Sequence, residues 1–283
     1  MLLRPGFTVN LLDPGVTRSS ISISSGSRPL ADASHAPDCT VATDDWRDLT
    51  DAAADVVLGD ALRPLSAPLA AAVSLLDLGP DQLQESHRTR LPLLAAGPGA
   101  AQDVYVEALR TYQSHVSQAL HDRYGIVPET TGAADLVVHR PGQPSTAYNP
   151  GIKAFMGLHI DSHQQLPFAD RAGAMTLCAV NVGVADRYLN FVNLPVRDLV
   201  EVLAAHGVTQ PESASALKNA FFARFPEYPV LRLTLRPGQA YLCNTQNTIH
   251  DGATNQDGRP DISFLSLHRM TDLVPHRSLA AVR

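Results

Sequence analysis

The sequence predicts an α+β fold in which helices precede a β-rich half. Up to Gly125 the chain is rich in Ala and Leu at helical spacing, whereas alternating and β-branched stretches dominate after Gly125. Apolar residues make up 45% of the 283 residues and charged residues 18%, so the chain is able to bury a large core. Helices and strands that are segregated along a chain are typical of folds in which helices cover one face of a strand-built core.

The first 125 residues divide into an arm and a helical part. Residues 1–45 are rich in Ser, Pro, Gly and Asp and predict an irregular arm, with a short strand at FTVNLL. Residues 46–125 are expected to form helical support for the strands. Helices are expected in DDWRDLTDAAADVVLGD, SAPLAAAVSLLDLG, DQLQESHRTRLPLL and AQDVYVEALRTYQSHVSQALHDRYG. The last of these is the strongest prediction, because Tyr105, Leu109, Tyr112, Val116 and Leu120 form one apolar stripe.

Residues 126–283 are expected to form the β-rich core. Strands are expected in ADLVVHRPG, AMTLCAVNVG, RYLNFVNLP, VLRLTLRPGQAYLCNTQ and DISFLSLHRM. Two helices, VRDLVEVLAAHG and SASALKNAFFARF, form a helical insert at residues 195–225. We therefore expect residues 46–283 to make a single domain.

Charge and composition exclude several classes of protein. The net charge is −6 and no long Lys/Arg run occurs, which argues against nonspecific nucleic-acid binding. The sequence contains no apolar run of about 18 residues, so no membrane helix is predicted. The N-terminal residues lack the pattern of a signal peptide. Cys39, Cys178 and Cys243 are scattered, so neither a zinc knuckle nor a disulfide framework is predicted. We expect a cytoplasmic protein, and its oligomeric state is not legible in the sequence.

The stretch FMGLHIDSHQQLPF carries the first chemical signal. If it is extended, His159 and Asp161 point to the same face. An imidazole and a carboxylate on one face suit a divalent metal, and a second histidine would complete the two-His-one-carboxylate set of non-haem Fe(II) sites. The best candidate for that histidine is His250, in RPGQAYLCNTQNTIHDG. Arg259 follows nine residues later and is able to bind a carboxylate through two hydrogen bonds.

This arrangement of His159, Asp161, His250 and Arg259 resembles the Fe(II)/2-oxoglutarate-dependent oxygenases over residues 135–270. The resemblance implies a double-stranded β-helix, or jelly roll, with N-terminal buttressing helices. It implies that the two histidines and the aspartate ligate Fe(II), that Arg259 binds the distal carboxylate of the co-substrate 2-oxoglutarate, and that O2 is consumed. Residues 46–283 would then be the catalytic domain.

The sequence departs from the family at the arginine. Many members read Arg-x-Ser, whereas this chain reads Arg259-Pro260-Asp261, so the serine contact is missing or moved to Ser263. In the family, residues in the positions of Asn181 and Arg187 often contact co-substrate or substrate. Arg269 is a rival to Arg259 for the anion. Family members that halogenate lack the carboxylate ligand. Because Asp161 is present, the resemblance implies hydroxylation, desaturation or cyclisation of a small molecule, such as an amino acid or natural-product intermediate.

Two other functions fit the same residues. A cupin-like metal enzyme or zinc hydrolase would use His159, His163 and His250 and would need no 2-oxoglutarate. Gly157 and Pro167 disfavour the helix that would place His159 and His163 together, so His163 is expected at the rim of the site. A jelly-roll binding module without metal or catalysis is the third hypothesis.

Tyr241 is either a co-substrate contact or an ordinary core residue.

Overall fold

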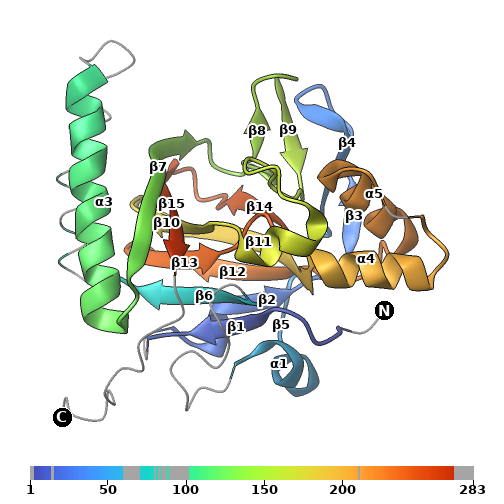
Figure 1. Cartoon of the computed structure of the whole chain (residues 1–283). Helices are drawn as coiled ribbons and strands as arrows, with labels where there is room; N and C mark the ends of the chain where they lie inside the picture. The colour runs from blue at the N-terminus through green and yellow to red at the C-terminus, as the bar shows by residue number, and fades with distance from the viewer. Residues whose placement is uncertain are drawn as a thin grey trace.

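The structure is a computed structural model that combines three β-sheets with helices on two sides (Figure 1). It describes residues 3–13, 16–59, 71–79, 102–209 and 211–270, together with residues 81, 84 and 88. The element order is mixed α+β, as the sequence predicts. Among the described residues, no helix combines the length and apolar character needed to cross a membrane.

Two sheets face each other and enclose the central core. The larger sheet has the strand order β1-β6-β13-β10-β15-β7 and the smaller has the order β14-β11-β12-β2-β5. The larger sheet consists of β1 (Thr8–Leu11), β6 (Ala72–Asp77), β13 (Gln239–Cys243), β10 (Thr176–Asn181), β15 (Asp261–Met270) and β7 (Pro128–His139). The smaller consists of β14 (Thr248–Thr254), β11 (Arg187–Pro195), β12 (Leu231–Leu235), β2 (Ile21–Ile23) and β5 (Arg47–Asp48). Their inner faces share one apolar cluster that includes Val73, Leu189, Phe191, Leu233 and Tyr241.

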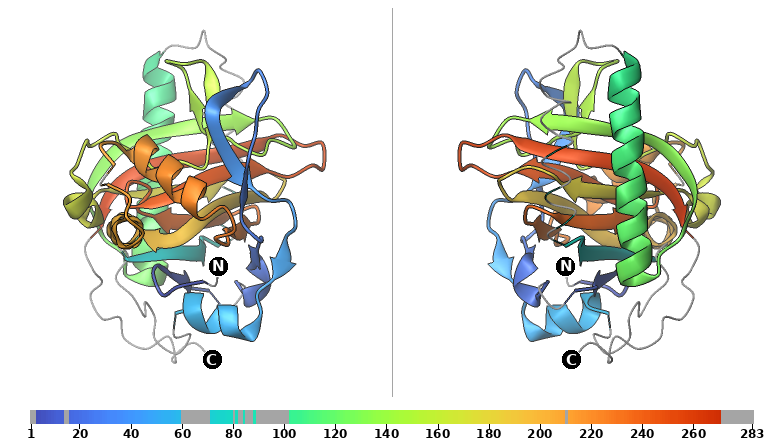
Figure 2. Two further views of the ribbon diagram at one scale, coloured as in Figure 1. Left: turned by 90° about the vertical axis from the view of Figure 1, so that its right-hand side faces the viewer. Right: turned by 90° about the vertical axis from the view of Figure 1, so that its left-hand side faces the viewer.

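Helices cover the outer faces of both sheets (Figure 2). Helix α3 (Gln102–Tyr124) lies across the larger sheet, where its buried stripe packs on strand residues such as Val180 and Phe264. Helices α4 (Val196–Ala205) and α5 (Ala214–Arg224) pack behind the smaller sheet with Leu158, Ile160 and Val192. The helical insert therefore buttresses the strands from outside. The short helix α1 (Asp51–Val57) is capped by the side chain of Thr50.

A third sheet leads the chain into the site. It has the order β3-β4-β9-β8 and consists of β3 (Ser27–Pro29), β4 (His35–Ala42), β9 (Ala154–Gly157) and β8 (Tyr148–Asn149). Gly157 ends β9 with a φ of 71°. A Cβ at Gly157 would lie 2.4 Å from the carbonyl oxygen of Thr40, so only glycine allows β4 to approach this closely. Two 3-10 turns complete the described elements, at Arg18–Ser20 and at Phe168–Gly173 (η4).

The N-terminal residues differ from the irregular arm expected for residues 1–45. Strand β1 forms an edge of the larger sheet, β2 lies in the smaller sheet, and β3 and β4 belong to the third. The short strand expected at FTVNLL is present as Thr8–Leu11. Strands β1, β2 and β3 have only three or four residues and carry almost no alternation of their own, so their pairing partners decide their structure.

The helix expected in SAPLAAAVSLLDLG is wrong, because Ala72–Asp77 forms strand β6. β6 pairs with β1 on one side and β13 on the other, and five of its six residues are buried. A short apolar run that is buried on both faces has the same appearance in sequence as a buried helix. The helix expected in DQLQESHRTRLPLL lies almost entirely outside the described residues.

The β-rich half agrees more closely with expectation. Strands β11 and β15 match RYLNFVNLP and DISFLSLHRM, and α4 and α5 match the two helices of the insert. β7 begins earlier than expected, at Pro128. β14 runs from Thr248 through His250 to Thr254, so His250 lies within a strand.

Candidate metal centre

Two histidines face each other across a pair of neighbouring chain segments. The backbone N–H of His159 donates to the carbonyl of His250 at 2.9 Å, and the N–H of His250 donates back at 2.8 Å. Residues paired in this way are directly opposite, so their side chains leave on the same side. The two imidazole rings have centroids 4.5 Å apart. His250 lies opposite Phe191 of β11, a residue of the central core, which places the rings on the inner face of the smaller sheet.

Backbone carbonyls fix the tautomer of both rings. His159 Nδ1 lies 2.8 Å from the carbonyl of Gly157, and His250 Nδ1 lies 3.2 Å from that of Thr248. A carbonyl oxygen only accepts, so in the neutral form of each ring Nδ1 carries the proton and Nε2 keeps its lone pair. Metal-bound histidines in proteins are oriented by this same kind of outer hydrogen bond.

Asp161 completes a cluster of three. Its carboxylate oxygens lie 3.4 Å from His159 Nε2 and 3.8 Å from His250 Nε2. One ligand atom from each residue lies within 4.8 Å of the other two, an arrangement able to hold a metal ion. The structure thus brings together the three residues that the sequence singles out as ligands, and two neutral Nε2 atoms with one carboxylate are the donors of the facial triad.

Burial and mutual charge perturb the three groups. Burial, together with neighbouring His159, lowers the pKa of His250 to about 4. Burial acts in the same direction on His159, but the hydrogen bond and charge of Asp161 outweigh it and raise its pKa. For Asp161 burial is again opposed, here by the two histidines, and the pKa falls well below its ordinary value. A permanently ionised carboxylate beside a neutral His250 is ready for a metal ion near neutral pH.

A buried arginine lies farther along the same inner surface. Arg187, at the start of β11, is only 3% exposed. A Cβ on Gly252, two residues beyond His250 and on the same face of β14, would lie 3.3 Å from Arg187 Nη2. Nη1 donates to Ser263 of β15 across the gap between the two sheets. Glycine at position 252 therefore leaves the space in which this guanidinium lies beside the histidines.

One edge of the Arg187 guanidinium has a donor without a hydrogen-bond partner among the described residues. Nε is buried and makes no hydrogen bond to the described residues. Its nearest carboxylate oxygen, Oδ1 of buried Asp261, is 3.8 Å away, beyond hydrogen-bond distance. Nε and Nη2 form the edge with which arginine binds carboxylates bidentately. Tyr241 is buried in the central core that the two sheets share, and burial raises the pKa of its hydroxyl.

The other residues predicted to contact the co-substrate are either exposed or bound to nearby backbone groups. The side chain of Arg259 is 55% exposed and binds Asp257 through Nε at 2.8 Å and through Nη2. Arg269 is exposed on β15. Asn181 is fully buried and donates to the carbonyls of Ala185 and Leu235, which hold the β10–β11 turn.

His163 lies at the rim of the cluster. Its Nδ1 is 4.0 Å from Asp161, and its side chain is 37% exposed. The group of residues able to share a metal ion contains Asp161 and not His163. The set of three histidines considered for a zinc hydrolase is therefore not the set that this geometry favours.

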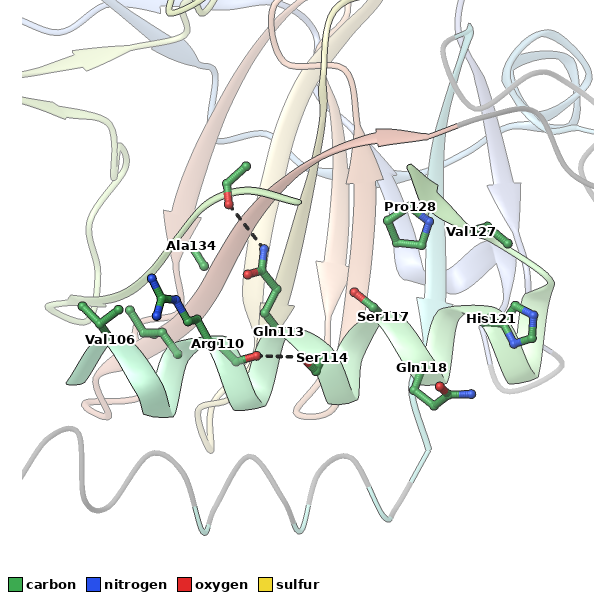
Figure 3. Close-up of a pocket in the computed structure, with 12 residues that line it drawn as sticks. Val106, Arg110, Gln113, Ser114, Ser117, Gln118, His121, Val127, Pro128 and Ala134 are labelled. Atoms are coloured by element: carbon green, nitrogen blue, oxygen red, sulfur yellow. Dashed lines mark hydrogen bonds between the residues drawn. The ribbon is translucent and has the colours of Figure 1, made fainter. Parts of the chain in front are cut away.

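A separate cavity of about 840 Å³ lies between α3 and β7 (Figure 3). It is lined by polar helix residues such as Arg110, Gln113 and Ser117 and by Ala134 of β7. Helix α3 packs on the outer face of the larger sheet, whereas the histidines occupy the inner face of the smaller sheet. The cavity does not belong to the metal cluster.

Comparisons with known proteins find matches only among solved structures. No protein-family profile and no curated protein matches the chain. Among solved structures, the Kdo hydroxylase KdoO, a non-heme Fe(II) alphaketoglutarate dependent dioxygenase in complex with alphaketoglutarate and Fe(III), is 13% identical, with 71% of this chain and 80% of that chain covered and a TM-score of 0.43. The epimerase SnoN in complex with Fe3+, alpha ketoglutarate and nogalamycin RO is also 13% identical, with 72% and 82% covered and a TM-score of 0.43. The function proposed below rests on the residues of the site.

Proposed function

We propose that this protein is an Fe(II)/2-oxoglutarate-dependent dioxygenase that oxidises a small molecule. The observation that carries the proposal is the cluster of His159, Asp161 and His250, in which both Nε2 atoms and the carboxylate converge within 4.8 Å. Two imidazoles and one carboxylate leave three positions of an octahedral ion open, the arrangement used by non-haem Fe(II) oxygenases. Two facing sheets with this cluster between them support the proposal, because that family is built on a jelly roll.

The residues present also fit the co-substrate. 2-Oxoglutarate is a five-carbon keto diacid whose keto acid end binds the metal, so its other carboxylate must meet a cation a few ångströms away. Two residues along a strand span about 7 Å, and Arg187 lies over Gly252, two residues from His250. The unsaturated Nε of Arg187 is a buried donor in need of an acceptor. Arg187, supported by Ser263, is therefore our candidate for the anchor in place of Arg259.

Each residue then has one task. His159, Asp161 and His250 hold the metal, Arg187 orients the co-substrate, and Tyr241 contributes to a site from which bulk water is largely excluded. Iron with bound 2-oxoglutarate and O2 supplies the oxidising power. In a hydroxylation, substrate R–H, O2 and 2-oxoglutarate give R–OH, succinate and CO2. The ligand side chains are recessed, with Asp161 the most exposed at 27%, which suits a small substrate.

The direct test is product formation by the iron-loaded protein. Protein supplied with Fe(II), 2-oxoglutarate and O2 should release succinate and CO2, and the correct substrate should accelerate that release. Amino acids are the first class to screen. Turnover that needs no 2-oxoglutarate would favour a hydrolase, and absence of both metal binding and succinate would favour a binding module.

A further inference from the structure

A second buried arginine lies behind the Asp161 ligand. Arg171 belongs to the turn η4 and is only 4% exposed. Its Nη1 donates to the backbone carbonyl of Asp161 at 2.8 Å and to that of Gln246 at 3.0 Å. Its Nη2 donates to Ser162 Oγ at 3.0 Å, and Nε donates to the carbonyl of Leu166 at 3.3 Å. All three guanidinium nitrogens are thus used to hold the chain around one metal ligand.

The acceptors connect the segments that carry two ligands. Asp161 follows β9 outside any strand, and its own N–H donates to the carbonyl of Thr245 at 3.1 Å. Gln246 lies just before β14, the strand of His250. One nitrogen of Arg171 therefore joins the Asp161 main chain to the segment that leads into the distal histidine.

Neighbouring amides fix the arginine itself. Asn244 Nδ2 donates to the Arg171 carbonyl at 2.8 Å. Gln246 Nε2 donates to Gln164 Oε1 at 2.5 Å, and the N–H of Gln164 donates back to Gln246 Oε1 at 2.9 Å. These contacts connect residues 161–171 with residues 244–246 through several hydrogen bonds of buried or half-buried groups.

The chemistry of the acceptors is unusual for a buried cation. All four are neutral oxygen atoms, whereas buried charges are ordinarily paired with an opposite charge. The acid whose charge acts on Arg171 is Asp161 itself, while burial lowers the arginine's pKa. The guanidinium is therefore held by the main chain of the ligand residue itself and by the segment that leads to His250.

We propose that Arg171 is a positioning residue of the metal centre, which fixes the backbone of Asp161 and thereby the direction of its carboxylate. This inference rests on the proposed metal site. Outer groups that orient metal ligands typically change metal affinity by about 10- to 100-fold when they are replaced. If Arg171 only anchored the turn, its replacement would lower the stability of the fold and leave the intrinsic metal affinity unchanged.

The test uses Arg171→Lys, which keeps the charge and loses the planar set of donors. Co(II) alone is the probe, because it binds the same donors as Fe(II) and its visible absorption reports the ligand geometry. Affinity is measured by calorimetry and by the Co(II)-induced rise in Tm above each variant's own apo value, which corrects for a change in stability. The control is Arg232→Lys at a half-buried arginine, whose guanidinium lies 3.7 Å from the Trp46 ring centroid on the outer face of the smaller sheet.

We expect Arg171→Lys to bind Co(II) at least about tenfold more weakly than the wild type, with an altered visible spectrum. Arg232→Lys should match the wild type in both readouts, although its apo Tm falls. If Arg171→Lys loses Tm but keeps the wild-type affinity and spectrum, the inference is overturned and the proposed function stands. If the wild-type protein fails to bind Co(II), the metal site itself is wrong.

Ser162→Ala provides a milder variant in case Arg171→Lys does not fold. It removes one acceptor of Arg171 at an exposed position and leaves the arginine in place. A fall of roughly two- to fivefold in Co(II) affinity supports the inference, since a hydrogen bond to a charged group contributes on the order of 1 kcal/mol. An affinity equal to that of the wild type contradicts it.

Discussion

The metal end and the arginine end of the interior are built in different ways. At the metal end, His159 and Asp161 lie within three residues and His250 pairs directly with His159. At the arginine end, Arg187, Gly252 and Ser263 come from three strands and meet across the gap between two sheets. The first arrangement is visible in a short motif, and the second exists only once the strands are in register.

The two ends also differ in which groups orient their side chains. The two histidines of the proposed metal site are oriented locally, by backbone carbonyls two residues away on their own segments. Arg187 is oriented by its neighbours, because Gly252 leaves it room and Ser263 accepts its Nη1. Substitutions at the two ends should therefore separate metal binding from co-substrate binding.

The largest effect is expected from Asp161→Ala. Loss of the only carboxylate in the cluster removes the charge that attracts a divalent ion, and succinate formation should disappear. Co(II) titration and a succinate assay check the prediction. Full turnover by the variant would exclude Asp161 as a ligand.

Arg187→Lys and Arg259→Lys form a matched pair at the other end. The first keeps a charge beside Asp261 but loses the Nε/Nη2 edge, so we expect the KM for 2-oxoglutarate to rise roughly 10- to 150-fold, or about 1.5–3 kcal/mol. Co(II) affinity should stay within about twofold of the wild-type value. Arg259→Lys should leave the KM unchanged, since exposed ion pairs contribute little. The reverse pattern would restore Arg259 as the anchor.

Gly252→Ala narrows the space that Arg187 occupies. The new Cβ would lie 2.1 Å from Thr146 Oγ1 and 3.3 Å from Arg187 Nη2, so both side chains must move. We expect a loss of about 1–3 kcal/mol in unfolding free energy and a several-fold rise in the KM for 2-oxoglutarate. Denaturant unfolding and steady-state kinetics measure the two effects. An unchanged KM with reduced stability would place the carboxylate elsewhere.

The smallest effect concerns the pH dependence of the metal-free protein. Because the folded pKa of His250 is lowered to about 4 from an ordinary 6.5, the unfolded chain binds a proton in that interval that the folded chain does not. The stability linked to His250 is therefore complete above pH 6.5 and decreases as the pH falls, by about 1 kcal/mol between pH 7 and 5.5. Asp251, whose pKa is raised by burial to about 6, has the opposite sign.

Comparison with His250→Gln isolates the contribution of His250. Unfolding is measured in EDTA at several pH values, and the variant should lose less stability than the wild type as the pH falls from 7 to 5.5. Equal pH dependence in the two proteins would mean that His250 is not held neutral by the fold.

Whether a residue of the site could be predicted from the sequence depends on how far apart in sequence its neighbours in the site lie. His159 and Asp161 share a face through the two-residue period of an extended chain, and the strand predicted after Pro237-Gly238 leads toward His250. The anchor was placed on Arg259 by family resemblance, whereas the buried, unsaturated arginine is Arg187. No local pattern distinguishes Arg187 from other strand arginines, because the glycine that makes its space is 65 residues away in sequence.

Prediction of the fold from the sequence also failed where the structure depends on residues far apart in the chain. Strands β11 and β15 have the boundaries that the sequence predicts. β6 was predicted as a helix because a strand that is buried on both faces has no alternation. Arg171 was not singled out, although its position ten residues after Asp161 would have suggested a contact had the turn at Phe168–Gly173 been recognised.

The central claim is that one metal ion and 2-oxoglutarate bind together at the inner face of the smaller sheet. Anaerobic addition of 2-oxoglutarate to the Fe(II)-loaded protein tests it most directly, because chelation of Fe(II) by the keto acid gives a weak visible charge-transfer band. We predict that the band appears in the wild type, is absent from Asp161→Ala, and needs more 2-oxoglutarate in Arg187→Lys. Saturable Fe(II) binding without any such band would contradict the claim.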